Sequence, residues 1–311
     1  MKRAILVAVL ALTLSGPAFA AREFEKVGTI GGQFLKIGVG ARAAAMGSAF
    51  ASVADDASSV YWNPAGVARI TRSVIAINHA DWVTDISFSQ ATYVFDPRYV
   101  PGMVALHVRS LYMPEQLVTT VTRPEGTGEK FDCGDIAASM TYARSLTDKF
   151  SAGITFNYLD CSLADQHSQA YAFDFGTLYD TGFQSLRIGM AIQNIGTEMK
   201  FVERTVKLPT MFRVGMSMSL YEDAQFRVLS AADFSHPPDN NERANVGTEV
   251  GYKDFLYLRA GYGFGYDAEG LGAGLGFKVP TSLNSEATVD YAFSDMGYLG
   301  GIHRISIDFR F

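Results

Sequence analysis

The feature that most constrains the fold of this chain is an alternation of apolar and polar residues from Ser73 to the C-terminus. The alternation recurs in blocks of roughly ten residues, as expected for membrane-spanning β-strands. In the last block the apolar residues are Ile305, Ile307, Phe309 and Phe311, and the polar ones are Arg304, Ser306, Asp308 and Arg310. In a soluble sandwich the apolar face would cover a second sheet. In a membrane barrel it faces lipid, and the polar face lines the lumen.

The blocks predict fourteen strands, and an even number is typical of bacterial single-chain barrels. Their ranges are 73–79, 86–95, 102–111, 135–144, 150–160, 170–179, 186–195, 208–220, 225–235, 243–252, 255–264, 270–279, 285–294 and 301–311. The connections after even-numbered strands are short, whereas most of those after odd-numbered strands are longer, above all 112–134 and 196–207. Short periplasmic turns that alternate with longer outer loops are typical of a membrane barrel, and a sandwich has no reason to show them.

We therefore expect an all-β protein, a fourteen-stranded antiparallel transmembrane barrel over 73–311 in the bacterial outer membrane, surrounded by lipid. Both barrel termini should be periplasmic. Residues 1–20 have the pattern of a signal peptide: Lys2 and Arg3, an apolar run over 4–14, and the small-residue cleavage pattern 18–20. That run is shorter than the ~18–20 residues that a membrane anchor needs. Without Lys2 and Arg3 the mature chain has 24 basic and 32 acidic residues, which disfavours a nucleic-acid partner.

The segment before the barrel has a different pattern. Residues 40–70 are rich in Ala and Gly and show no alternation. Ala41–Ala54 suits a short helix with small residues, and Ala57–Tyr61 suits a second helical turn capped by an aspartate. Asn63-Pro64-Ala65-Gly66 suits a turn, in which Pro64 favours an extended Asn63. Because 21–72 is too small to fold alone, we expect it to fill the lumen as a helical plug.

The plug sequence resembles the N-terminal segment of the PorV/PorQ family of outer-membrane proteins and, more distantly, the hatch of FadL-type transporters. The residues that carry the resemblance are Gly38, Gly40-Ala41-Arg42-Ala43, Met46-Gly47, Ala49-Phe50, Ala54-Asp55-Asp56-Ala57 and Tyr61-Trp62-Asn63-Pro64-Ala65-Gly66. The resemblance implies one of two roles. A FadL-like barrel would carry hydrophobic compounds past the hatch, whereas a PorV-like barrel would bind exported cargo or partner proteins of type IX secretion without conducting. No single residue chooses between them; the leading hypothesis is a FadL-like barrel that transports or binds hydrophobic compounds or exported cargo, and the alternative is a non-conducting component of type IX secretion that binds secreted substrates.

Two plug motifs are candidate site residues. Asn63-Pro64-Ala65-Gly66 is either a gate or a structural turn, and both can hold, because an Asn amide can satisfy plug backbone at the lumen wall. Asp55 and Asp56 need partners if they are buried, so we expect ion pairs with lumen arginines such as Arg304 or Arg310. A metal site is disfavoured, since two adjacent carboxylates lack the further oxygen ligands that Ca²⁺ needs.

Cys133 and Cys161 are the only cysteines, and the exported compartment permits a disulfide. Each lies fourteen residues from Thr147, the centre of the predicted turn 145–149. Equal distance from the turn places them opposite each other on adjacent antiparallel strands and on the same face. We expect a disulfide, and the alternatives are two unpaired thiols or a register slip that separates them.

Enzymatic activity is not expected. Outer-membrane phospholipases use a barrel-wall Ser and His, but none of the five histidines here lies in a nucleophile motif such as G-x-S-x-G. They are His79, His107, His167, His236 and His303. The Gly-rich segment 261–276 lacks the Lys-Ser/Thr of a phosphate loop and suits two strands whose glycines allow the plug to approach closely. No cofactor is expected, and 237–242 should be an exposed polar loop.

The chain ends on an aromatic residue, Phe311, in phase with the apolar face of the last strand. A terminal aromatic at this position resembles the signal that the barrel-assembly machinery recognises. We therefore expect that machinery as a partner, together with lipid and with hydrophobic small molecules or secreted proteins.

Overall fold

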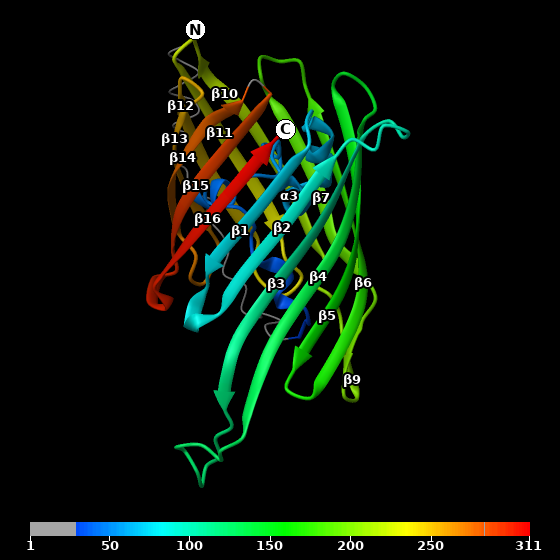
Figure 1. Ribbon diagram of the computed structural model, residues 1–311, viewed down its shortest axis with the longest axis vertical. Coiled ribbons are helices and arrows are strands. Elements are labelled where there is room, and N and C mark those ends of the chain that lie inside the picture. Colours follow the sequence, from blue (N-terminus) through cyan, green and yellow to red (C-terminus); the bar gives the residue numbers. More distant parts are fainter. Residues whose placement is uncertain (1–28, 283) are drawn as a thin grey trace.

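The alternating segments form one closed wall in the computed structural model, which describes residues 29–282 and 284–311. Fourteen antiparallel strands pair in a ring, and β1 pairs with β16 to close it (Figure 1). They are β1 (Val74–Asp81), β2 (Ser87–Phe95), β3 (Met103–Leu117), β4 (Lys130–Ser145), β5 (Phe150–Leu163), β6 (Gln166–Asp180), β7 (Arg187–Gly196), β10 (Met211–Glu222), β11 (Phe226–His236), β12 (Arg243–Tyr252), β13 (Leu256–Phe264), β14 (Leu271–Ser282), β15 (Ser285–Asp295) and β16 (Gly301–Arg310). The predicted fourteen-stranded barrel is confirmed, whereas the predicted signal peptide lies outside the described residues.

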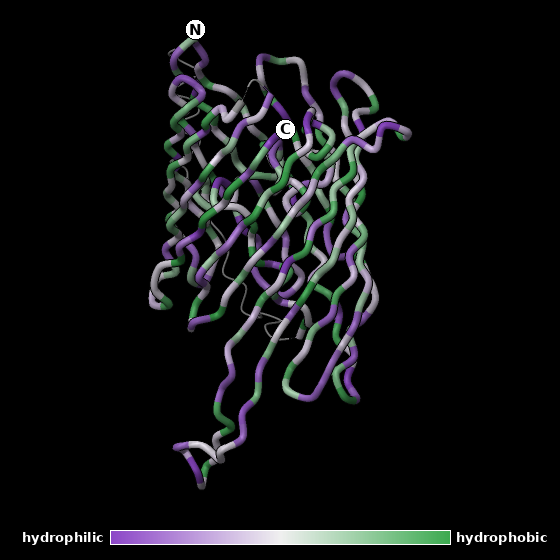
Figure 2. Tube along the Cα trace, viewed as in Figure 1, coloured by the Kyte–Doolittle hydropathy of each residue, from purple (hydrophilic) through white to green (hydrophobic). Residues whose placement is uncertain are grey.

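The alternation gives the wall an apolar outer face and a polar inner face. On β16, Ile305 and Ile307 are about half exposed, at 50% and 49%, whereas Arg304 and Ser306, which alternate with them, are buried. Along the strands hydrophobic and hydrophilic residues alternate in the same way (Figure 2). Exposed Ile, Leu, Phe and Tyr side chains on this outer surface fit a wall that faces lipid, where water does not penalise apolar exposure.

The two ends of the barrel carry different connections. The short-turn end holds 96–102, 146–149, 181–186, 223–225, 253–255 and the connection between β14 and β15, and the C-terminus lies at this end. The long-loop end holds 82–86, 118–129, 164–165, 197–210, 237–242, 265–270 and 296–300. Within 197–210 a small hairpin forms from β8 (Met199–Phe201) and β9 (Arg204–Val206). Short and longer connections therefore alternate largely as the sequence predicted.

Four strands are longer than predicted by three residues or more. Strands β3, β4, β5 and β6 have 15, 16, 14 and 15 residues and reach beyond the other strands at the long-loop end (Figure 1). The predicted strands ended where the apolar alternation fades, but backbone pairing continues through polar residues to Leu117↔Lys130 and Leu163↔Gln166. A tight turn at 164–165 consequently replaces the longer connection expected between β5 and β6.

Inside the wall lies the plug, made of short helical turns joined by extended chain. Its elements are η1 (Gln33–Lys36), α2 (Ala41–Ala45), α3 (Ser59–Trp62) and η2 (Pro64–Arg69). Short η3 (Val83–Asp85) and η4 (Gly297–Leu299) lie in connections of the barrel. None of the helices within the described residues is long and apolar enough to cross a bilayer.

The predicted helix over Ala41–Ala54 is wrong beyond Ala45. Gly47 and Ser48 both adopt positive φ, at 67° for Ser48 and 61° for Gly47, which ends a right-handed helix. The physical reason is contact with the wall: a Cβ on Gly47 would lie within 3.0 Å of the Tyr262 backbone nitrogen. From this point the chain leaves the helix and follows the inner surface of the barrel.

Candidate functional site

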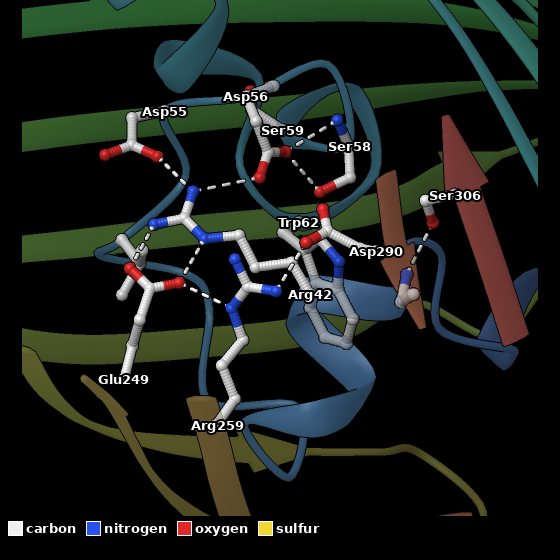
Figure 3. Close-up of polar contacts among 12 residues, drawn as sticks. Arg42, Asp55, Asp56, Ser58, Ser59, Trp62, Glu249, Arg259, Asp290 and Ser306 are labelled. Atoms are coloured by element: carbon white, nitrogen blue, oxygen red, sulfur yellow. Dashed lines mark hydrogen bonds and ion pairs between the residues drawn. The ribbon is translucent and has the colours of Figure 1, made fainter. Parts of the chain in front are cut away.

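The plug is joined to the wall by a buried ionic network centred on Arg42 in α2 (Figure 3). Arg42 Nη1 lies 2.6 Å from Asp55 Oδ1 and 3.0 Å from Asp56 Oδ2, both in the plug. Its Nε and Nη2 donate to the two carboxylate oxygens of Glu249 on β12, at 2.8 and 3.0 Å. One guanidinium therefore holds two turns of the plug together and fastens them to the wall by a bidentate pair.

A second arginine extends the network around the wall. Arg259 on β13 lies 2.6 Å from Glu249 and 2.5 Å from Asp290 on β15. The side chains of Arg259 and Glu249 are only 2% and 4% exposed. Two guanidiniums thus serve four carboxylates, of which Asp55 is partly exposed and the other three are buried, and removing a cation from a buried group of this kind leaves carboxylates uncompensated. Beside the network, Ala41 N at the start of α2 donates to Ser306 Oγ at 2.7 Å.

The sequence predicted paired aspartates but named the wrong partners. Asp55 and Asp56 bind Arg42 of the plug itself, whereas Arg304 donates to Ser294 Oγ and Arg310 to Glu286. Burial would raise the pKa of the Asp55 carboxyl, but the charge of Arg42 and its hydrogen bond outweigh burial and hold that pKa below its usual value. Among the described residues no group of three or more His, Cys, Asp and Glu side chains is arranged to hold a metal ion.

Asn63 links three parts of the structure. Its Nδ2 donates to the plug carbonyl of Ala51 at 2.8 Å and to the wall carbonyl of Thr177 at 3.0 Å, while its Oδ1 accepts from Ala65 N at 3.1 Å. Asn63 is extended, with φ −161°, and Pro64 begins η2, which continues through Gly66. The side chain thus satisfies plug and wall backbone as expected, and a gating role for Asn63-Pro64-Ala65-Gly66 stays a prediction.

A set of wall glycines, here called the glycine belt, touches the plug directly. At each of them a Cβ atom would lie within 3.0 Å of a plug atom. They are Gly153 on β5, Gly176 on β6, Gly189 on β7, Gly247 on β12, Gly261 on β13, and Gly272 and Gly274 on β14. The register pairs Gly153 with Gly176, and Gly261 with both Gly247 and Gly272. The plug approaches the wall closely at 261–276, as expected. It also does so at a second group of strands, β5–β7.

Two further aspartates fasten the plug, and the sequence analysis missed both. Asp233 on β11 accepts from Phe50 N and Ala51 N, at 2.8 and 2.7 Å. Asp239 lies in the loop 237–242 and bonds Lys36 of η1 at 2.9 Å. The expectation that this loop is exposed is wrong except at Glu242: Pro237 and Asp239 are buried, with Asp239 only 5% exposed, because the loop folds inward onto the plug. A carboxylate in phase with the lumen face was the available signal for Asp233.

The cysteines are not directly opposite each other, so this part of the prediction is wrong. Cys133 pairs with Leu163, and Cys161 pairs with Asp135, because the β4–β5 turn centres on Asp148 rather than Thr147. A one-residue shift of the turn centre moves the cross-strand partner by two residues. The two thiols are free in this structure and lie as diagonal neighbours on the same face.

The disulfide itself stays a prediction. Diagonal neighbours on one face are about 7–8 Å apart between Cα atoms, slightly beyond the usual disulfide range, so a bond would need a small backbone movement. We expect thiol titration of the exported protein in denaturant to detect no free thiol without reductant and two with it. Detection of two free thiols without reductant would contradict the disulfide.

The remaining candidate residues are scattered. The five histidines lie on five different strands, β1, β3, β6, β11 and β16, so the fold does not gather them into one site. Phe311 is 47% exposed, stacks on Phe309 with ring centroids 5.8 Å apart, and donates its backbone N–H to Ser73 O. Its role in assembly stays a prediction.

A closed fourteen-stranded barrel with an apolar outer face and a lumen filled by an N-terminal plug is the architecture of an outer-membrane protein. The family model described as type IX secretion system protein PorV matches residues 20–237, which is most of the chain. The chain therefore belongs to the PorV family.

Solved structures that share the fold include hydrocarbon transporters and channels. The toluene transporter TodX of Pseudomonas putida is 11% identical, with a TM-score of 0.61, over 88% of this chain and 98% of its own. The monoaromatic hydrocarbon channel CymD is 12% identical, with a TM-score of 0.59, over 88% and 96%. A FadL homologue of Pseudomonas aeruginosa is 10% identical, with a TM-score of 0.55, over 88% and 98%. No curated protein matches the sequence. At these identities the likeness shows the fold alone.

Proposed function

We propose that this protein is a closed outer-membrane subunit of type IX secretion, which binds exported protein at its long-loop end and does not conduct. The observation that carries the proposal is the attachment of the plug. Arg42, Asn63 and Asp233 fasten it to different strands, and the glycine belt brings its backbone against six strands. Where plug and wall touch in this way, a side chain has no room between them, and neither has a solute.

The long-loop end offers a surface for an exported partner. Strands β3–β6 extend past the other strands there (Figure 1), and their outer parts carry exposed apolar side chains. Leu117 is 50% exposed and Leu163 49%. Beyond the membrane, apolar groups at the end of a stiff hairpin are characteristic of a protein-binding surface. The PorV family match supports exported protein as the partner.

A flux measurement on liposomes tests the proposal. We expect wild-type protein to admit neither a small polar dye nor a hydrophobic probe faster than empty liposomes do. Changing Asn63-Pro64-Ala65 to Gly-Gly-Gly removes the amide bonds to Ala51 and Thr177 and should increase dye flux several-fold. The same change at 97–99, on the exposed β2–β3 turn, is the matched control and should leave flux unchanged.

Rapid entry of the hydrophobic probe through wild-type protein would contradict the proposal and favour transport of hydrophobic compounds. Unchanged permeability of the Gly-Gly-Gly variant would contradict the gate role of Asn63-Pro64-Ala65. Binding is tested separately with a photo-crosslinker at position 117 in cells that secrete by the type IX route. We expect adducts with secreted substrates there, but none from position 255 at the short-turn end.

A further inference from the structure

A small cavity lies against the plug at the long-loop end, with a volume of about 30 Å³. Three arginines from separate strands line it: Arg213 on β10, Arg243 on β12 and Arg304 on β16. Arg213 and Arg304 are 4% and 7% exposed. Arg243 is only partly buried, so the cavity reaches solvent beside the loop 265–270. Three guanidiniums therefore converge on one space from different directions.

None of these three guanidiniums has a carboxylate within ion-pair distance among the described residues, unlike Arg42 and Arg259. Each lies over an aromatic ring instead: Arg213 over Trp62 at 4.7 Å, Arg243 over Tyr266 at 4.3 Å, and Arg304 over Trp82 at 5.3 Å. Stacking on an aromatic ring fixes the orientation of a guanidinium. Its N–H groups lie in the guanidinium plane and stay free to donate.

Several of the donors at the cavity are unsatisfied. The Nε atoms of Arg243 and Arg304 and the Oγ atom of Ser235 are buried without a hydrogen-bond partner. Other donors are used, since Arg213 Nε donates to Gln193 and Arg304 Nη1 to Ser294. Buried polar groups are normally satisfied, so orphaned donors on three residues that line one cavity indicate a missing acceptor.

The net charge of the residues that line the cavity also indicates a missing acceptor. Glu269 and Asp295 also line it, and Lys36 is already neutralised by Asp239. Three arginines against two carboxylates leave an excess of positive charge, whereas the Arg42 network has an excess of carboxylates. The missing acceptor should therefore be an anion.

We propose that this cavity is an anion-binding site that takes a compact oxyanion, either a carboxylate, a sulfate or a phosphate group. Oxyanions match the planar donor edge of arginine and accept several hydrogen bonds at once. A space of about 30 Å³ holds about two water molecules, which limits the buried part of the ligand to its charged group. The site does not depend on whether the barrel conducts. Its ligand is either a free ion or the charged end of a larger molecule.

The two tryptophans of the chain provide a direct readout, because Trp62 and Trp82 both lie beneath arginines of this cavity. We expect sulfate, phosphate or acetate to change the tryptophan fluorescence of the full-length protein, in nonionic detergent at fixed ionic strength, in a saturable manner. Arg243→Gln removes one guanidinium and its N–H donors from the cavity. It should raise the apparent Kd for these anions at least tenfold. Arg227→Gln, on an exposed residue of β11, is the matched control and should leave Kd unchanged.

Ser235→Ala is a second, conservative variant that should weaken binding several-fold even if Arg243→Gln fails to fold. A saturable response to the free ions identifies a free oxyanion as a sufficient ligand. A response only to octyl sulfate or octanoate, weakened in Ser235→Ala, supports the charged end of a larger molecule. The proposal is overturned if no probe gives a saturable change, or if both cavity variants bind as the wild type does.

Discussion

Arg42→Ala is expected to detach the plug from the wall while the barrel itself stays folded. The substitution leaves Asp55, Asp56 and Glu249 without the cation that bridges them, and an uncompensated buried charge costs about 3–5 kcal/mol. Amide hydrogen exchange across 41–63 should therefore become ~100-fold faster or more, since each 1.4 kcal/mol is a factor of ten. Exchange in the strands away from the network should change little.

Two further variants make this prediction sharp. Arg42→Lys keeps the charge but loses the bidentate bond to Glu249, so its exchange should lie between those of wild type and Arg42→Ala. Arg72→Ala removes a more exposed arginine that pairs with Glu286 at the short-turn end and should leave the plug protected. Wild-type protection of 41–63 in Arg42→Ala would show that the ionic network does not hold the plug.

Gly261→Ala is expected to destabilise the contact between plug and wall by steric overlap alone. A Cβ at this position would lie within 3.0 Å of the Met46 carbonyl group and the Gly47 backbone nitrogen. Backbone atoms cannot rotate away as a flexible side chain can, so we expect a loss at or above the upper end of the ~1–3 kcal/mol typical of overpacking. The measurement is the denaturant concentration at which half of the reconstituted barrel is unfolded. Unfolding is monitored by the change in migration of unheated samples on gels.

Gly134→Ala is the matched control, because it lies on a strand of the same wall but away from the glycine belt. Its nearest neighbour would be Ser162 Oγ at 3.4 Å, an ordinary contact, so its stability should stay within about 0.5 kcal/mol of wild type. Equal midpoints for the Gly261 and Gly134 variants would mean that the plug has room to move. That result would also weaken the case for a closed lumen.

The last strand shows how much of the fold can be predicted from the sequence. The phase that separates Ile305 and Ile307 from Arg304 and Ser306 is a local property, since successive side chains of a strand point to opposite faces. The same reasoning placed all fourteen strands and gave the wall its two faces. It failed at the outer ends of β3–β6, because backbone pairing needs no apolar side chains and continues where alternation stops.

The ionic partners of Asp55 and Asp56 could not be predicted from the sequence. Arg42 and Glu249 are separated by 207 residues and meet only because the closed ring brings β12 beside α2. Any of several lumen-facing charges satisfied the requirement that Asp55 and Asp56 be paired. The choice among them depends on how the plug lies inside the barrel, which is a property of the assembled wall.

The sequence by itself determined the barrel, the direction of each strand face and the plug that fills the lumen, because periodicity and small-residue composition act within one segment. Only the tertiary structure decided which side chains meet across the lumen. Cys133 and Cys161 illustrate the limit, since one residue at a turn shifted their register by two. The cavity of Arg213, Arg243 and Arg304 likewise exists only after closure, which brings donors from three distant strands to one point.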